Sequence, residues 1–184
     1  MNKKEYIERY INRLQTLAEP ETENRAALAA LRRALSGNPR YVTDTFQHIG
    51  WYLPDSQREQ DAYVLVGALF AYHPQSASED NLGAHFATLR KRWEKAQKRT
   101  ESLERRFNGL LRAHPDDLTS HLRSAISLLK RDEVPVHWEQ LLYDVCYWGH
   151  FNRFVQRDWA NAFWGQSAQK EPGALQQDTD SQDN

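Results

Sequence analysis

The stretch from Val134 to Trp164, VPVHWEQLLYDVCYWGHFNRFVQRDWANAFW, decides the fold class of this chain. Its apolar residues recur every three or four positions, first over 138–148 and again over 151–163. This step matches the 3.6-residue period of an amphipathic helix, and Gly149 lies where the two runs meet. We therefore expect two helices, one on each side of Gly149, that bury an aromatic-rich core.

The rest of the chain repeats the helical pattern. Glycine and proline separate segments of helical periodicity, and no segment shows the sustained two-residue alternation of a strand. The stretches 37–41 and 50–54 are expected to be loop or short helix. From Gln166 onward the chain loses nearly all large apolar residues, which predicts a disordered tail. The sequence predicts an all-α protein of about eight helices, over residues 3–18, 22–36, 56–72, 82–97, 99–113, 116–131, 136–148 and 150–165.

The tryptophans have two possible roles, because an aromatic ring can pack in a core or stack on an unpaired base. Helical phasing favours the core for four of them, whereas Trp51 and Tyr41 lie in expected loops and are open candidates for stacking. Cys146 is the single cysteine, which excludes an intramolecular disulfide, and we expect it to be a small buried residue. The predicted core tryptophans are Trp138, Trp148, Trp159 and Trp164.

Charge is distributed very unevenly along the chain, although the formal net charge is only −1. Residues 86–131 carry 12 basic and 5 acidic side chains, a local charge of +7, whereas residues 132–184 carry 3 and 9, a local charge of −6. Exposed charges more than about 8 Å apart are largely screened at physiological salt. A local basic face can therefore attract an anionic polymer even in a near-neutral protein.

The basic side chains of the middle segment recur at helical spacing. Lys98, Arg105 and Arg112 are seven residues apart, nearly two turns, and lie opposite the apolar stripe of their helix. Arg123 and Lys130 have the same spacing. Guanidinium groups suit phosphate, and phosphate contacts grip a backbone without reading bases. The predicted nucleic-acid-binding residues are Arg25, Arg32, Arg33, Arg40, Lys91, Lys98, Arg105, Arg112, Arg123, Lys130 and Arg131.

A solvated face offers an alternative explanation for these cations, with intrahelical pairs to glutamates such as Glu94 and Glu101. Few acids intervene between residues 86 and 131, which favours a patch that contacts a nucleic-acid backbone. Arg106, nearer the Phe107 side of its helix, is instead a candidate for an internal ion pair.

Catalytic and metal-binding roles find little support in the sequence. The seven histidines are scattered, and only Cys146 and His150 have a metal-like i,i+4 spacing, with no second pair. Asp116-Asp117 is typical of the start of a helix, and Asp132-Glu133 is typical of a turn between helices. Asp144 is expected to be a polar residue on an aromatic helix whose hydrogen bonds are satisfied within the protein. No P-loop, dinucleotide fingerprint or nucleophile elbow occurs. We expect no enzymatic activity, no cofactor and no metal site.

Five short segments carry a more specific signal through their order and spacing than any of them does alone. They are Arg25-Ala26-Ala27-Leu28-Ala29-Ala30-Leu31-Arg32-Arg33, Asn81-Leu82-Gly83, Arg105-Arg106-Phe107-x-x-Leu110-Leu111, Trp138-x-x-Leu141 and Trp159-Ala160-x-x-Phe163-Trp164. Together, over roughly residues 22–164, they resemble the CasB small-subunit family of the type I-E CRISPR surveillance complex, Cascade.

The resemblance implies an all-helical subunit of two packed sub-bundles, which we expect over residues 1–97 and 98–166, followed by the disordered tail over 167–184. It also implies a head-to-tail dimer in contact with the crRNA-carrying backbone subunits and the large subunit of Cascade. There the subunit would help to hold the crRNA–target DNA hybrid and the displaced single-stranded DNA. The RNA–DNA heteroduplex that forms in an R-loop is about as stable as the DNA duplex it replaces. Protein contacts to the backbone of the displaced strand can therefore shift this equilibrium toward the R-loop.

Two alternatives stay open at this point. A helical protein–protein adaptor would use the basic edges against acidic partner surfaces, without direct nucleic-acid contact. A nucleic-acid-processing enzyme would need a catalytic constellation that the sequence does not supply. No run of 18 apolar residues occurs and the N-terminus is not apolar, which predicts a cytoplasmic protein with no membrane partner.

Overall fold

The computed structural model describes residues 2–19 and 24–168, with side chains up to residue 165. Within these residues the chain forms α-helices, two short 3-10 helices and no strand, which confirms the all-α prediction. Of the predicted tail, residues 167 and 168 end the last helix, and the remainder lies outside the described residues. The helices are α1 (Lys3–Ala18), α2 (Arg25–Ala34), α3 (Pro39–Ile49), η2 (Gly50–Tyr52), α4 (Gln57–Tyr72), α5 (Leu82–Lys95), α6 (Glu101–Leu111), η3 (Pro115–Asp117), α7 (Leu118–Arg131), α8 (Trp138–Cys146) and α9 (Phe154–Ala168).

Helix α3 is the main element that the sequence pattern did not resolve. It begins at Pro39, where proline's fixed φ suits the first helical turn, and the Asn38 side chain accepts a hydrogen bond from the Arg40 N–H. Its buried face contains Thr45, whose hydroxyl donates to the carbonyl oxygen of Val42 at 2.7 Å. A polar residue at a core position weakens the apolar periodicity. The sequence pattern predicts loop or short helix for residues 37–41 and assigns no element to residues 42–49, which form most of α3.

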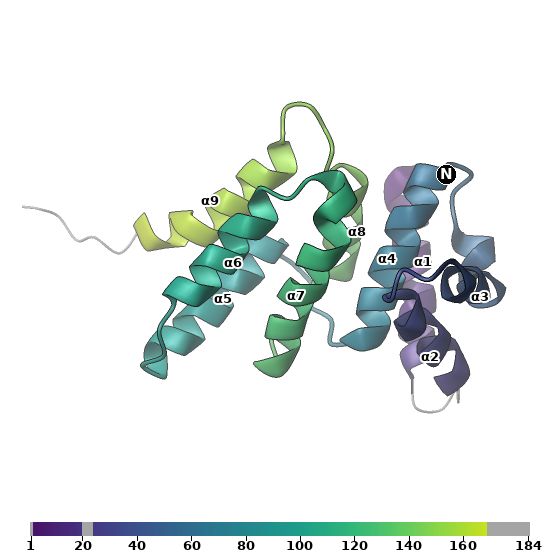
Figure 1. The fold of residues 1–184 in the computed structure, drawn as a ribbon, viewed down its shortest axis with the longest axis horizontal. Coiled ribbons are helices and arrows are strands. Elements are labelled where there is room, and N and C mark those ends of the chain that lie inside the picture. Colours follow the sequence, from purple (N-terminus) through teal and green to yellow (C-terminus); the bar gives the residue numbers. More distant parts are fainter. Residues whose placement is uncertain (1, 20–23, 169–184) are drawn as a thin grey trace, which may run out of the picture.

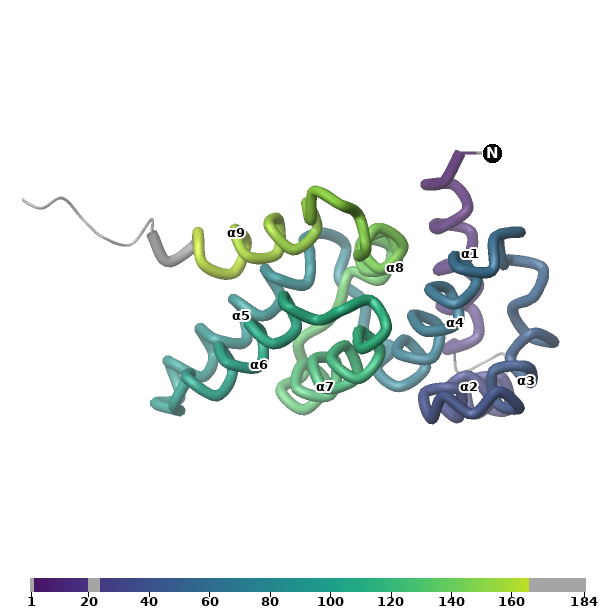
Figure 2. The backbone as a smooth tube through the Cα atoms, turned by 45° about the horizontal axis from the view of Figure 1, so that its top comes forward, coloured from purple at the N-terminus to yellow at the C-terminus, as the bar shows by residue number. Residues whose placement is uncertain are grey.

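The helices form an elongated arrangement with α2 and α3 at one end and α5, α6 and α9 at the other (Figures 1 and 2). Helix α2 packs mainly on α3 and α4, and α5 packs mainly on α9. Helix α8 contacts α1 and α4, and its Asp144 accepts the indole N–H of Trp159 from α9, so α8 joins the two ends. The division of the chain into sub-bundles at residue 97 stays a prediction. Among the described residues, no helix combines the length and apolar character required to cross a bilayer.

The core around α5 and α9 is built from stacked aromatic rings. Phe107 lies between Phe86 and Phe163, with ring centroids 5.1 and 4.3 Å away, and the Trp148 and Trp159 rings lie 5.0 Å apart. All five side chains are buried. Burial of such rings contributes most of the stability of a small helical domain, at roughly 25 cal/mol per Å² of apolar surface.

The core assignment of the tryptophans is confirmed for Trp138, Trp148 and Trp159 and is wrong for Trp164. Trp164 is 38% exposed because its neighbour along α9, Phe163, occupies the inward position. Phe151, placed in the predicted apolar stripe, is 90% exposed. The reason is that α9 begins at residue 154 instead of 150, so Phe151 falls in the connection before the helix.

The close approach of α5 and α9 depends on Gly83. A Cβ atom at position 83 would overlap the backbone carbonyl group of Trp159, so the two helix backbones touch at this point. Asn81 supports the same contact, because its side-chain Oδ1 caps α5 at the Ala84 N–H and its Nδ2 donates to the Asp158 carbonyl oxygen at 3.4 Å. Two of the five sequence segments, 81–83 and 159–164, therefore meet in space.

Two connections cross between the ends of the molecule and pair with each other. The Ala77 N–H donates to the Val136 carbonyl oxygen at 2.9 Å, and the Val136 N–H donates to the Gln75 carbonyl oxygen at 3.1 Å. The indole N–H of Trp138 donates to the same Gln75 oxygen at 3.2 Å. This pairing fixes the α4–α5 connection against the α7–α8 connection.

Two buried histidines hold the second connection in place. His73 Nε2 lies 2.8 Å from the Val134 carbonyl oxygen, and His85 Nε2 accepts the His137 backbone N–H at 3.0 Å. Burial lowers the pKa of both imidazoles, to about 4 for His85, because a charged ring loses its hydration there. The acceptor role of His85 Nε2 also requires an unprotonated nitrogen, so this ring is neutral and structural at neutral pH.

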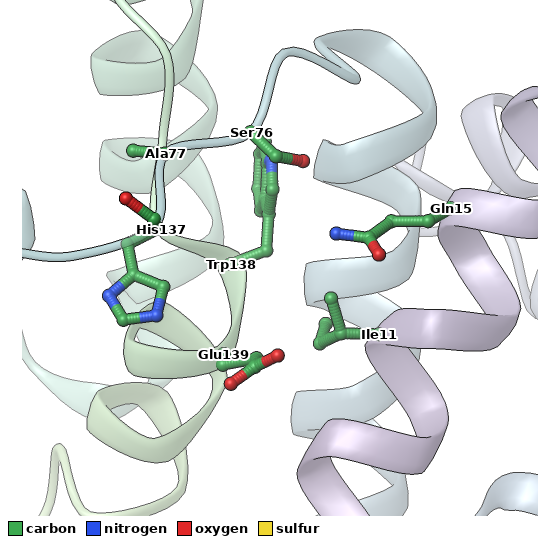
Figure 3. Close-up of a pocket in the computed structure, with 8 residues that line it drawn as sticks. Ile11, Gln15, Ser76, Ala77, His137, Trp138 and Glu139 are labelled. Carbon is green, nitrogen blue, oxygen red and sulfur yellow. The ribbon is translucent and has the colours of Figure 1, made fainter.

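A cavity of about 390 Å³ lies beside this crossing, between α1 and the start of α8 (Figure 3). Ile11 and Gln15 line it from α1, and Trp138 and Glu139 line it from α8. None of its lining residues is a predicted nucleic-acid-binding residue. The cavity is therefore a feature of the joint between helices and not of the basic surface.

Candidate nucleic-acid interface

The structure places all eleven predicted nucleic-acid-binding residues on the surface. They do not form one patch. Four of them lie on α2 and the start of α3, at one end of the molecule, and the other seven lie on α5, α6, α7 and the α5–α6 connection (Figures 1 and 2). Helix α4 separates α2 from α7 in both views. The predicted residues thus lie on two separate surfaces.

Two of the three residues in the predicted basic line, Arg105 on α6 and Arg112 at its C-cap, have the predicted exposure, whereas Lys98 lies in the α5–α6 connection. Leu103, Phe107 and Leu110 are buried, whereas Arg105 and Arg112 are exposed on the opposite face. Neither arginine side chain has a hydrogen bond or ion pair with another described residue. Two guanidinium groups, nearly two turns apart and without intramolecular partners, are available to phosphate oxygens.

Helix α7 adds a second basic edge beside α6. Arg123 is exposed and has no side-chain partner within the described part of the chain. Lys130 is also exposed, but its Nζ donates to the Tyr72 carbonyl oxygen at 2.7 Å and lies 3.9 Å from the centroid of the Tyr72 ring. Gly109 of α6 faces His121 of α7, so the two helices pack closely enough to present their outward cations on adjoining surfaces.

Lys98 and Arg131 converge on one carboxylate, that of Asp132. Lys98 Nζ lies 3.7 Å from Asp132 Oδ1, and Arg131 donates from Nε and Nη2 to Oδ2 at 3.1 and 3.0 Å. The indole N–H of Trp93 donates to Oδ1 at 3.1 Å. Arg92 donates to the backbone carbonyl oxygens of Asp132 and Glu133. We give the name Asp132 corner to Trp93, Arg92, Lys98, Arg131 and Asp132, where part of the positive charge is already neutralised.

The α2–α3 surface carries the remaining predicted arginines. Arg25, Arg32 and Arg40 are exposed and their side chains have no partner among the residues described, whereas the Arg33 guanidinium lies 5.9 Å from the Tyr41 ring centroid. Tyr41 itself is 38% exposed. Lys91, on α5, is exposed and lies apart from this group.

The exposed arginines that the sequence prediction left out include Arg106, Arg153 and Arg157. Arg106 has no internal ion pair in the described chain, so its proposed anchoring role is wrong. Arg153 lies in the α8–α9 connection, where its Nη2 donates to the Leu111 carbonyl oxygen at 2.6 Å. Arg157 follows one turn later on α9 and is exposed. A loop arginine has no helical phase, so only the fold reveals that Arg153 lies beside the end of α6.

The acidic and sulfur-containing candidates have structural surroundings. Asp144 accepts the Trp159 indole N–H at 2.6 Å and the Gln140 amide at 2.8 Å, as predicted for a satisfied polar residue. Burial raises the pKa of Asp144 to about 6 and that of Cys146 to about 11. Cys146 is only half-buried. The described residues contain no group of three or more histidine, cysteine or carboxylate side chains placed to hold a metal ion.

Comparison with known proteins agrees with this helical architecture and supplies the family. Residues 27–164 match the family model of the CRISPR-associated protein Cse2. The chain belongs to the Cse2 family. The CRISPR-associated protein Cse2 of Thermus thermophilus is 34% identical to it over 149 residues, which cover 79% of this chain and 83% of that protein.

Solved structures extend the match to the whole Cse2 fold. The crystal structure of CasB from Thermus thermophilus aligns with a TM-score of 0.70 at 27% identity and covers 90% of this chain and 99% of its own. A chain of a CRISPR RNA-guided surveillance complex aligns with a TM-score of 0.73 at 25% identity, over 91% of this chain and 99% of that one. The resemblance to CasB drawn from the five segments is thereby confirmed.

Proposed function

We propose that this Cse2 chain is a non-catalytic subunit of a cytoplasmic Cascade complex that holds the displaced DNA strand through its phosphates. The observation that carries the proposal is the set of arginines without a partner among the described residues on adjoining elements, namely Arg105 on α6, Arg112 at its C-cap and Arg123 on α7. We call this set the α6–α7 face. In the complex the chain also contacts the backbone and large subunits, a second copy of itself, and the crRNA–target DNA hybrid.

The chemistry of the α6–α7 face suits a strand whose sequence changes with every guide. Guanidinium groups bind phosphate oxygens and release condensed counterions, and this interaction is independent of base identity. The near-neutral net charge of the chain predicts weak binding by the isolated subunit and stronger binding in the complex, where neighbouring subunits confine the strand. The surveillance-complex chain that shares this fold supports the assignment to such a complex.

The test is R-loop formation by the reconstituted complex across a salt series. We expect the triple variant Arg105→Ala/Arg112→Ala/Arg123→Ala to assemble normally and to flatten the log–log salt slope by about 2, because each phosphate contact to a single strand contributes roughly 0.7. The loss should be alike for every guide sequence.

The chain offers a matched control for this variant. Arg25→Ala/Arg32→Ala/Arg40→Ala removes three equally unpartnered arginines from the α2–α3 surface. A flattened slope in both triples would extend the interface to both surfaces. An unchanged slope and affinity in the α6–α7 triple, with intact assembly, would contradict the proposal and favour the adaptor alternative.

A further inference from the structure

The α8–α9 connection holds one aromatic ring out in solvent. Phe151 is 90% exposed, whereas the neighbouring aromatic side chains of Trp148 and Phe154 are buried and half-buried. A large apolar side chain gains nothing for folding at such a position, because burial is the source of its stabilising free energy. The ring rests against the His150 imidazole at a centroid distance of 4.6 Å.

Hydrogen bonds fix the turn that presents this ring. The His150 N–H donates to the Tyr147 carbonyl oxygen and the Arg153 N–H donates to the His150 carbonyl oxygen, both at 2.9 Å. Asn152 Oδ1 accepts the Phe154 N–H at 3.2 Å and lies 2.7 Å from His150 Nδ1. Arg153 adopts a left-handed conformation with φ of 52°. The exposed position of Phe151 is therefore set before any partner arrives, which lowers the entropic cost of binding.

The same turn continues the basic line of α6. Arg153 Nη2 donates to the carbonyl oxygen of Leu111, and Arg112 is the next residue along the chain. Figure 1 shows the α8–α9 connection beside the end of α6. Arg157 adds an exposed cation one turn into α9, and its side chain has no partner within the described residues. Phosphates bound along Arg105 and Arg112 would therefore lead toward Phe151.

The other side of the turn faces a hollow of about 250 Å³ that carries charges of both signs. Asp61 and Asp116 line this hollow, and so does Arg58, whose guanidinium lies against Gly149. The unpaired positive charge near Phe151 therefore lies on the α6 side of the turn, at Arg112 and Arg153.

We propose that Phe151 is a stacking platform for an unpaired base of the DNA strand whose phosphates contact Arg112 and Arg153. Exposed aromatic rings beside cations that track a backbone are the shared chemistry of single-strand binding surfaces, and stacking tolerates any base. This inference rests on the proposed function and adds to it a selection for single-stranded over duplex DNA, since the bases of a duplex are already stacked on one another. The nearby arginines favour this ligand over a protein partner.

The experiment compares Phe151→Ala with Trp51→Ala in the reconstituted complex. Trp51 is 91% exposed on η2, near the opposite end of the molecule, so its replacement removes an equally exposed ring at a distance from the basic line. We expect Phe151→Ala to weaken retention of the displaced strand about 5- to 100-fold without changing the salt slope, because stacking carries no charge. Phe151→Tyr should retain binding, and Trp51→Ala should leave it unchanged.

A fluorescent base gives a local readout for the same complexes. With 2-aminopurine placed singly along the displaced strand, we expect one position to be quenched in the wild type and bright in Phe151→Ala. Unchanged retention and emission in Phe151→Ala, while the α6–α7 triple loses binding, would overturn the stacking inference and leave the proposed function standing. Failure of Phe151→Ala to assemble would identify the ring as a protein anchor and would equally overturn it.

Discussion

Asp144 and Asp132 each accept a hydrogen bond from a tryptophan indole, yet the two carboxylates have opposite surroundings. Asp144, on α8, is buried and has only neutral donors, Trp159 and Gln140. Asp132, at the end of α7, has Trp93 and the cations of the Asp132 corner. Hydrogen bonds alone do not offset the loss of hydration at Asp144, whereas charge pairs accompany them at Asp132. Asp144 therefore stabilises the position of Trp159 in the core, whereas Asp132 sets how much positive charge on the surface is left without a carboxylate partner.

The largest expected effect follows from the buried carboxylate. The pKa of Asp144 is raised from 3.8 to about 6, so the unfolded chain loses this proton at lower pH than the folded chain. Wild-type stability from this group therefore falls as pH rises from about 4 to about 6, by roughly 3 kcal/mol in all. Asp144→Asn has no carboxyl to ionise and so avoids this loss. The free energy of unfolding of Asp144→Asn, measured relative to wild type, should therefore increase by about 3 kcal/mol between about pH 4 and pH 6.

Urea midpoints of both proteins at several pH values measure this difference. His85 provides the internal check, because its lowered pKa, about 4, has the opposite consequence. The unfolded imidazole takes up a proton below about 6.5 and the buried one does not, so acid destabilises the fold. Asp144→Asn should consequently unfold more readily in acid than at neutral pH. A difference between Asp144→Asn and wild type that is constant with pH would contradict the raised pKa.

An intermediate effect is expected from Asp132→Asn. The change weakens hydrogen bonds from Trp93 and Arg131 and should lower the free energy of unfolding by about 1.5–3 kcal/mol, the range for a hydrogen bond that involves a charged group. It also releases Lys98 and Arg131 from their carboxylate. We expect the displaced strand to be retained more tightly by the assembled complex, with a salt slope steeper by up to about 1.4 if both cations reach phosphates.

This variant contrasts directly with the arginine removals, because it increases the positive charge of the same half of the molecule. Denaturation and strand retention are measured on the same preparation. A loss of strand retention in a stable Asp132→Asn subunit would mean that the Asp132 corner orients its cations for binding and does not neutralise them.

The smallest effect is expected from Lys98→Ala. Its ammonium lies 3.7 Å from Asp132, and 57% of the lysine side chain is exposed, so solvent screens the pair. Exposed pairs of this kind contribute about 0–1 kcal/mol. In chemical denaturation, the free energy of unfolding of Lys98→Ala should therefore lie within about 1 kcal/mol of the wild-type value. It should be clearly higher than that of Asp132→Asn. Equal losses in the two variants would show that the lysine, and not Trp93 or Arg131, accounts for the carboxylate's role.

Helical phase explains which features the sequence revealed. It predicted the exposure of Arg105 and Arg112 correctly because a seven-residue step returns each side chain to the same face. It did not reveal that Lys98 and Arg131 meet at Asp132, since that meeting depends on how the α5–α6 connection packs against the end of α7. Ion pairs between different elements depend on the tertiary structure, and the spacing of residues within one helix does not predict them.

Connections were the other source of error. Apolar periodicity wrongly places Phe151 in the core and says nothing about Arg153, because both residues lie in a turn where neither helical nor strand periodicity applies. The apolar periodicity of helix α3 is weakened by a buried threonine, Thr45, whose hydroxyl donates a hydrogen bond within its own helix. Apolar periodicity therefore located the long amphipathic helices well, and the functional details of the turns required the three-dimensional arrangement.

The contact of Gly83 with Trp159 has a consequence for the chain as it is synthesised. Helix α5 ends at Lys95 and its main partner, α9, begins at Phe154, so about 60 residues must be added before the two can dock. At about 5–20 residues per second, the apolar face of α5 waits about 3–12 s on the ribosome. Helix α2 finds α4 far sooner. The end of the nascent subunit built from α2 and α4 can therefore fold while the end built on α5 still waits for α9.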